Sequence, residues 1–219
     1  MQRADQNKFL QQANLRIMKI ACLDLEGVLV PEIWIGLAEK TGIDELRATT
    51  RDIPDYAALM RQRLSILDKY GLGNDDLQQV IGTLAPLPGA IEYLDWLRER
   101  FQVVILSDTF YEFSKPLMRQ LGWPTLLCHR LKIDNEGRIV DFVLRQKDPK
   151  RSAVQAFQGL GYRVIATGDS YNDISMLDQA DAGILFRAPE QVKKEYSQYP
   201  SVEQYRDLQQ QFESASESL

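Results

Sequence analysis

The chain has 219 residues, of which 44% are hydrophobic and 26% are charged. This is ordinary globular composition, and it excludes disordered, collagen-like and disulfide-scaffold proteins. Lys and Arg number 26 against 31 Asp and Glu, and the resulting formal charge of -5 argues against a nucleic-acid partner. One α/β domain, or a core domain with a smaller insertion, fits this length.

The cysteine content and the lack of targeting signals favour a cytoplasmic protein without a membrane partner. Cys22 and Cys128 form no CxxC pair, so neither a disulfide framework nor a thiolate zinc site is expected. The single histidine, His129, follows an apolar strand away from the motifs, and we expect it to be structural. No apolar run approaches the ~20 residues that span a bilayer. Residues 1–17 are polar and lack the apolar stretch of a secretory signal, so we expect a flexible leader or an upstream start.

The next feature is an alternation of strands and helices. Three apolar runs predict buried strands, each followed by polar residues: Lys19–Leu23 before Asp24, Val103–Leu106 before Ser107 and Asp108, and Val164–Thr167 before Gly168 and Asp169. Helical periodicity predicts the segments between and after them: Ala90–Arg100, Tyr111–Gln120, Lys150–Leu160 and Ile174–Gln179. The alternation implies a parallel sheet with right-handed crossovers. Polar residues at the carboxyl ends of such strands face the crevice where α/β folds bind ligands.

An insertion interrupts this alternation after the first strand. Consecutive helices are predicted there: Ile33–Lys40, Tyr56–Tyr70 with Asp55 as its cap, and a helix that Asn74 caps and that runs through Leu84. We therefore predict a helical cap domain over residues 32–85 and a core domain made of residues 18–31 and 86–219. Within that core, Leu131–Leu144 is expected to form a β-hairpin, and Tyr205–Phe212 an amphipathic helix.

The first strand leads into the motif DLEGVLV, which contains two acids. Asp24 stands at the strand end and Glu26 two residues further on. A carboxylate there can attack phosphorus if a cation screens the repulsion, and a second acid can protonate the leaving oxygen. Taken alone, Asp24 fits a helix cap and Glu26 a solvated charge equally well.

The third strand leads into the motif GDSYND. Asp169 and Asp173 lie four residues apart across a strand-to-helix turn, so both can face the crevice. Oxygen ligands of this kind suit Mg²⁺. The alternative is a turn in which Asp169 and Asn172 only cap backbone groups.

Phosphate-binding groups are predicted at two further places. A hydroxyl and the next backbone N–H, at Ser107 and Asp108, can bind phosphate oxygens without adding negative charge. Lys147 and Lys150 precede the helix that leads to GDSYND, and either can neutralise a transferring phosphoryl group.

Together, Asp24-x-Glu26, Ser107, a lysine near position 150 and GDSYND, with a helical insertion after the first motif, resemble the haloacid dehalogenase-like phosphatase superfamily. The resemblance covers nearly the whole chain from Lys19. It implies a Rossmann-like core, a Mg²⁺ cofactor and an aspartyl-phosphate on Asp24. Receiver domains share strand-end aspartates and a lysine, but they lack the insertion and the GDSYND turn.

The insertion narrows the resemblance to phosphoserine phosphatases. Tyr56-x6-Arg63 is similar to their cap helix, in which the aromatic residue shields the site and the arginine grips the substrate carboxylate. Glu32 stands one residue out of register from their acid for the substrate ammonium. The family usually has Asp at the position of Glu26 and Thr at that of Val28.

Two longer segments, DLEGVLVPEIW and SDTFYEFSKPLMRQLG, look most like a bacterial subgroup of bifunctional phosphoserine phosphatase/homoserine phosphotransferase proteins. This implies small-molecule substrates, phosphoserine and homoserine, and a phosphoryl group that passes to homoserine or to water. Two rival hypotheses are another small phosphomonoester as substrate and a non-catalytic phosphate-binding module. A homodimer is compatible with the aromatic and methionine content of the insertion.

The same resemblance implies a role for each site residue. Asp24 is the nucleophile, and Glu26 is the proton donor and acceptor. The Asp24 carboxylate, the Glu26 backbone carbonyl and Asp169 hold Mg²⁺, with Asp173 behind them or reached through water. Lys150 is preferred over Lys147 because it begins the helix, and Asn172 orients the lysine or a phosphate oxygen.

Overall fold

The fold is built on one seven-stranded sheet in the computed structural model, which describes residues 18–49, 52–53 and 55–219. The expected leader, residues 1–17, lies outside the described residues. The strands run in the order β4-β3-β2-β1-β5-β6-β7, parallel except for β4. Their bounds are β1 Lys19–Leu23, β2 Gln102–Phe110, β3 Thr125–Ile133, β4 Ile139–Val143, β5 Arg163–Gly168, β6 Ala182–Phe186 and β7 Ser201–Val202.

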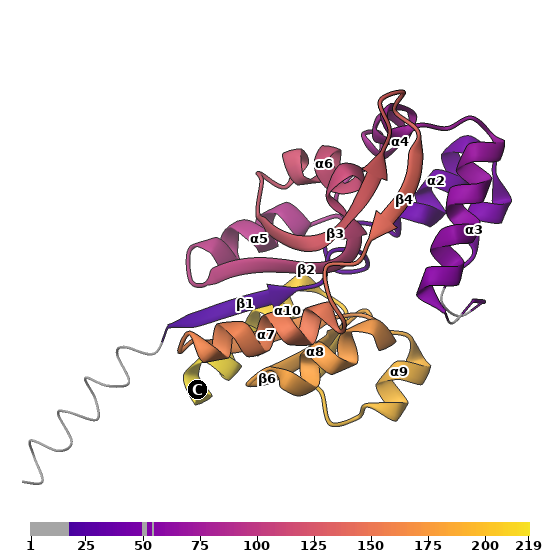
Figure 1. The fold of residues 1–219 in the computed structure, drawn as a ribbon. Coiled ribbons are helices and arrows are strands. Elements are labelled where there is room, and N and C mark those ends of the chain that lie inside the picture. The colour runs from indigo at the N-terminus through magenta and orange to yellow at the C-terminus, as the bar shows by residue number, and fades with distance from the viewer. Residues whose placement is uncertain (1–17, 50–51, 54) are drawn as a thin grey trace, which may run out of the picture.

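Helices cover both faces of this sheet (Figure 1). The α-helices are α2 Ile33–Thr41, α3 Tyr56–Lys69, α4 Asn74–Ile81, α5 Ala90–Arg98, α6 Tyr111–Gln120, α7 Pro149–Gly159, α8 Ile174–Gln179, α9 Glu190–Glu195 and α10 Tyr205–Ser218, and two 3₁₀ helices are η1 Asp44–Arg47 and η2 Tyr171–Asp173. The predicted strands and helices are therefore confirmed, with ends that shift by a few residues. The strands β6 and β7 were not predicted.

Alternate side chains of β1 feed two separate apolar cores, as expected for a strand buried on both faces. Ala21 and Leu23 join the larger core, which includes residues of α5 and α10. Ile20 and Cys22 join the smaller core, formed with α7, α8 and α9. The central strands are thus held on both sides, and their carboxyl ends are fixed relative to one another.

The insertion forms the helices α2, η1, α3 and α4, and its described residues contain no strand. Asp55 caps α3 by accepting the amides of Ala57 and Ala58, as predicted. Gly73, not Asn74, precedes the first turn of α4, which ends at Ile81 instead of Leu84. In Figure 1, α2 and α3 lie beyond the arrowheads of the central strands, where a cap over the crevice is expected. The division into cap and core domains stays a prediction.

The predicted hairpin is present, but its first strand begins earlier, at Thr125. Its early part pairs in parallel with β2, so that Phe110 stands opposite His129. The register of this pairing shifts between Leu106 and Phe110. This irregularity falls on the stretch that carries Ser107 and Asp108, at the edge where the site is expected.

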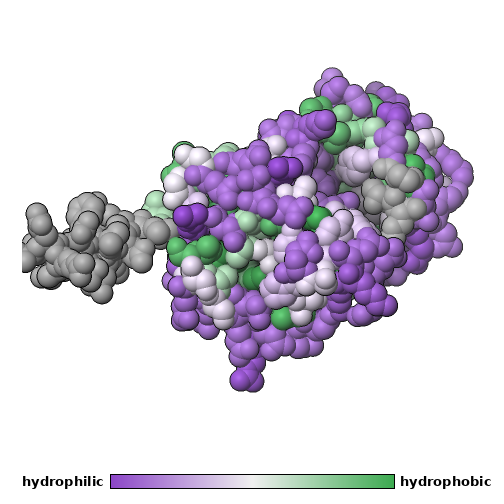
Figure 2. All heavy atoms as spheres, turned by 90° about the horizontal axis from the view of Figure 1, so that it is seen from below, coloured by the Kyte–Doolittle hydropathy of each residue, from purple (hydrophilic) through white to green (hydrophobic). Residues whose placement is uncertain are grey.

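The C-terminal helix α10 is longer than predicted and packs against the core. Phe212 and Tyr205 both contact the ring of buried Tyr93 on α5. No helix among the described residues is long and apolar enough to cross a membrane. The face drawn in Figure 2 is mostly hydrophilic, with small separate hydrophobic groups.

Candidate active site

A cavity of about 360 Å³ lies at the carboxyl edge of the sheet, under the insertion. Every site residue predicted from the sequence lines it except Asp173, which is fully buried behind it. The cavity is lined by Asp24, Glu26, Glu32, Trp34, Ile35, Thr49, Tyr56, Leu59, Arg63, Ser107, Asp108, Thr109, Lys150, Asp169, Ser170, Tyr171 and Asn172. Core motifs and insertion thus meet at one place.

Asp24 lies at the floor of the cavity and is 6% exposed. Its backbone N–H continues the sheet by donating to Thr167, and its Oδ1 accepts the amide of Leu25 at 2.7 Å. Burial, and then the nearby Asp173, raise the pKa of Asp24 well above its usual range. The ionised form of Asp24 therefore needs positive charge nearby.

Lys150 supplies part of that charge. Its Nζ lies 3.0 Å from Asp24 Oδ1 and 2.7 Å from Asp173 Oδ1. Burial alone would lower the pKa of Lys150, but the surrounding carboxylates raise it well above its usual range. Lys147 is exposed and does not line the cavity. Of the two candidate lysines, only Lys150 therefore reaches Asp24.

Asp173 holds both Lys150 and the GDSYND turn. While Oδ1 accepts from Lys150, Oδ2 accepts the backbone N–H groups of Asp169 and Ser170 at 3.0 and 3.1 Å. A Cβ at Gly168 would overlap the Asp173 side chain, so the glycine of the motif is needed for this close approach. The bonds already made by Asp173 suit a positioning residue better than a direct ligand.

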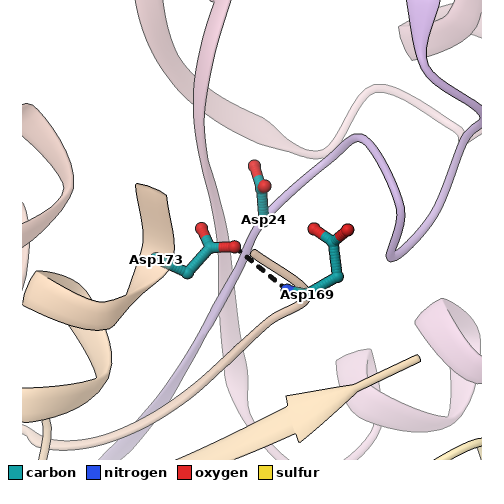
Figure 3. A group of neighbouring side chains, drawn as sticks. All are labelled: Asp24, Asp169 and Asp173. Carbon is teal, nitrogen blue, oxygen red and sulfur yellow. Dashed lines mark hydrogen bonds between the residues drawn. The ribbon is translucent and has the colours of Figure 1, made fainter. Parts of the chain in front are cut away.

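Asp24 follows β1, Asp169 follows β5 and Asp173 ends η2, and the three side chains converge (Figure 3). Each offers a carboxylate oxygen, and these atoms lie within 4.8 Å of one another. Burial, and then Asp173 and Glu32, raise the pKa of Asp169 to about 7. A Cβ at Gly27 would overlap the Asp169 carboxylate, so this glycine, at φ 75°, leaves room for it. A set of carboxylate oxygens with this repulsion, which Lys150 offsets only in part, fits a hard divalent cation.

Glu26 connects the first motif to the insertion. Its Oε2 accepts the amide of Ile33 at 2.8 Å, at the start of α2. Burial, and then the neighbouring Glu32, raise the pKa of Glu26 to about 8. An acid with this pKa keeps its proton at neutral pH, so Glu26 is suited to donate it.

The end of β2 brings Ser107 and Asp108 to the same cavity. Ser107 is 3% exposed, and its Oγ accepts the amide of Thr109 at 3.2 Å. The Asp108 side chain is 30% exposed, and Lys150 lies 3.8 Å from its Oδ2. Its backbone carbonyl accepts the Tyr56 hydroxyl at 2.8 Å, which ties the insertion to the core.

Arg63 reaches the cavity from α3. Its guanidinium lies over the Trp34 ring at 4.4 Å, and Nη2 donates to the Ala48 carbonyl at 2.9 Å. Its Nε is buried and has no hydrogen-bond partner among the described residues. Burial lowers the pKa of Arg63 to about 10, so it still carries its charge at neutral pH. A buried guanidinium with one unsatisfied N–H at a cavity wall suits an anionic ligand.

Sequence reasoning missed the contribution of Trp34 and misplaced His129. The expectation that His129 lies away from the motifs is wrong, because its Nε2 is 3.5 Å from Asp108 Oδ1. The pairing of β3 beside β2 brings them together. The signal available was that Asp108 and His129 each sit near the end of an apolar run; which strands are neighbours is not encoded locally.

The comparisons with known proteins agree with this geometry. The family model described as haloacid dehalogenase-like hydrolase matches residues 18–181. The chain therefore belongs to the haloacid dehalogenase-like hydrolases.

Within this family, the chain is similar to phosphoserine phosphatases. It is 69% identical over 199 residues to a Pseudomonas aeruginosa protein named phosphoserine phosphatase ThrH, covering 91% of this chain and 97% of that protein. It is 67% identical to a Pseudomonas syringae pv. tomato phosphoserine phosphatase, covering 91% of this chain and 84% of that protein. A substrate-bound phosphoserine phosphatase structure, 19% identical, has the same fold with a TM-score of 0.72 over 89% of this chain and 98% of that one.

Proposed function

We propose that this enzyme is a phosphoserine phosphatase that passes the phosphoryl group through Asp24 to water or to homoserine. The observation that carries the proposal is Asp24 beside Lys150 at the floor of a cavity whose cap-side wall holds Arg63. The 69% identical relative with the printed name phosphoserine phosphatase ThrH supports the same substrate.

In the first half-reaction, a carboxylate oxygen of Asp24 attacks phosphorus and the bond to the serine oxygen breaks. Lys150 and the Ser107 hydroxyl offset the charge on the phosphoryl oxygens. Glu26 donates its proton to the departing serine oxygen, which its raised pKa, about 8, permits at neutral pH. The phosphoryl group is then carried by Asp24 as an acyl phosphate.

In the second half-reaction, an acceptor oxygen attacks phosphorus, and Asp24 is released as a carboxylate. The ionised Glu26 takes the proton of the acceptor. Serine and homoserine share the amino-acid head group and differ by one methylene, so Arg63 and Glu32 can hold either. Tyr56, hydrogen-bonded to the core at 2.8 Å, helps to enclose the cavity and to exclude bulk water.

The metal ion of this family is proposed here to be Mg²⁺. Asp24, Asp169 and the backbone carbonyl of Glu26 would hold it, with Asp173 positioned behind them. When bound, the ion screens the repulsion between the nucleophile and the phosphate. We further propose that Asn172, on the exposed side of the cavity, orients a phosphate oxygen or Lys150.

The experiment is to incubate the protein with Mg²⁺ and phosphoserine, with and without homoserine, and to measure phosphate and phosphohomoserine together. Phosphohomoserine formed at the expense of phosphate supports the transferase, and phosphate alone supports a plain phosphatase. Neither product overturns the proposal and favours a different phosphomonoester or a non-catalytic module. Stabilisation by beryllium fluoride with Mg²⁺ then separates these two, because only a competent site mimics the aspartyl-phosphate.

A homodimer and a cytoplasmic location remain predictions from the sequence. Light scattering of the purified full chain measures the first, and cell fractionation measures the second.

A further inference from the structure

Asp108 places an additional carboxylate in the cavity. Its side chain is 30% exposed, and its nearest nitrogen neighbours among the described residues are Lys150 Nζ at 3.8 Å and His129 Nε2 at 3.5 Å. Both distances exceed the ~2.7–2.9 Å of a good charge-assisted hydrogen bond. Lys150 itself is closer to Asp173 and Asp24, at 2.7 and 3.0 Å. The Asp108 carboxylate therefore keeps hydrogen-bonding capacity for a ligand in the cavity.

His129 faces this carboxylate through its Nε2. It is 3% exposed, and its Nδ1 accepts the amide of Arg145 at 3.1 Å. A ring nitrogen that accepts a hydrogen bond carries no proton, so the proton sits on Nε2, which faces Asp108. The rings of Phe110 and Tyr56, with centroids at 6.0 and 6.1 Å, pack against the imidazole. Its orientation is thus set by the backbone and by two aromatic neighbours.

The charge of Asp108 points to the kind of group it meets. A carboxylate beside Lys150 repels phosphate and would weaken the binding of a purely anionic ester. The repulsion is offset if the substrate also carries a cation close to its phosphate. An amino-acid phosphate does, and its carboxylate has a separate partner in Arg63.

We propose that the Asp108 carboxylate binds the ammonium group of the amino-acid substrate and acceptor, and that His129 is the positioning residue that aims it. This deepens the proposed function and rests on it. On this proposal, Asp108 acts together with Glu32 on the ammonium.

The test compares phosphoserine with 3-phosphooxypropionate, the same ester without the amino group. Asp108→Asn keeps the size of the side chain and removes its charge. We expect it to lower kcat/KM for phosphoserine about 10- to 100-fold, mainly through KM, and to change that for the deaminated ester about threefold or less. Asp95→Asn, at an exposed position of α5, is the matched control and should change neither.

His129 is tested by two substitutions, of which only one keeps a hydrogen-bond donor. His129→Leu should show the same selective loss on phosphoserine, whereas His129→Gln, whose amide N–H can stand in for Nε2–H, should recover most of it. Equal losses on both esters, or no loss with His129→Leu, would overturn the inference. If wild-type protein turns over only the deaminated ester, the proposed substrate is wrong and the inference falls with it; if it turns over neither, the proposed activity itself fails.

A spectroscopic readout is independent of turnover. Because His129 is the only histidine, the imidazole ¹⁵N signals of the full chain belong to it alone. We expect the Nε2–H tautomer, and a shift of the Nε2 signal when serine is added to wild type but not to Asp108→Asn. The Nδ1–H tautomer, or an equal shift in both proteins, would contradict the proposed arrangement.

Discussion

The two edges of the sheet treat their aspartates in opposite ways. At the carboxyl edge, burial and neighbouring acids raise the pKa of Asp24 well above its usual range, and that of Asp169 to about 7. At the amino edge, Asp181 precedes β6 and accepts the amide of Val164 at 2.9 Å and Arg163 Nη1 at 2.7 Å. Burial alone would raise the pKa of Asp181, but these donors lower it overall.

This difference separates function from stability within one sheet. A carboxyl whose pKa is raised by folding reduces the free energy of unfolding near neutral pH, whereas one whose pKa is lowered increases it. The acids at the carboxyl edge therefore lower the stability of the fold, as expected at a catalytic site. The contrast yields four predictions. Two concern the floor of the site, one concerns Arg63 on the insertion side of the cavity, which we call its roof, and one concerns the amino edge.

The largest expected effect is that of Asp24→Asn. The substitution removes the nucleophile, so phosphate release should fall by about 1000-fold or more. Because it also removes one charge from a cluster of buried acids, the melting temperature in metal-free buffer should stay the same or rise. Near-normal release of phosphate would show that Asp24 is not the nucleophile, and a large fall in melting temperature would contradict the comparison of the two edges.

Next comes Lys150→Met, compared with Lys147→Met. Loss of Lys150 leaves Asp24 and Asp173 without their common cation, so kcat should fall by about 100-fold or more. The free energy of unfolding should fall by roughly 3 kcal/mol, because buried charges lose their partner. Lys147 is exposed, and its substitution should change neither quantity. Urea titration and initial rates measure both, and similar effects of the two substitutions would contradict this assignment.

The floor of the site is the part that the sequence predicted best. The strand ends at Asp24 and Asp169 follow from short apolar runs next to acids, which are local signals, and the motifs carried the family resemblance. Lys147 and Lys150 could not be separated by spacing alone. The distinction arises because Lys150 is buried at the start of α7 and reaches Asp24 across the sheet.

The residues at the roof of the site and beside it could not be predicted from local sequence, because their positions depend on tertiary structure. Arg63 was identified only through the resemblance, since an arginine on an amphipathic helix has no distinctive local pattern. Trp34 beneath it and His129 beside Asp108 were not anticipated, because each becomes part of the site by packing between distant segments. The sheet order that brings β3 to β2 is the decisive missing information.

At the roof, Arg63→Leu should separate recognition from stability. Without the guanidinium, kcat/KM for phosphoserine should fall about 10- to 100-fold, with little change for an aryl phosphate that has no carboxylate. Burial lowers the pKa of Arg63 to about 10, below that of the unfolded chain, so its charge opposes folding at neutral pH. Leucine also loses the contact with the Trp34 ring and the hydrogen bond to Ala48, so the melting temperature should change little. An equal loss on both esters would show that Arg63 does not serve the substrate carboxylate.

The smallest effect is expected at the amino edge, with Asp181→Asn. The folded state lowers the pKa of Asp181, so its contribution is fully present above the pKa of the unfolded side chain and is lost as pH falls through the folded value. At pH 7 the substitution should reduce the free energy of unfolding by about 1 kcal/mol, and the difference should shrink below about pH 4. Phosphatase activity should not change, because Asp181 does not line the cavity. Urea titrations of both proteins across this pH range measure the difference. A gap that stays constant with pH would mean that the carboxylate charge of Asp181 is not what stabilises this edge.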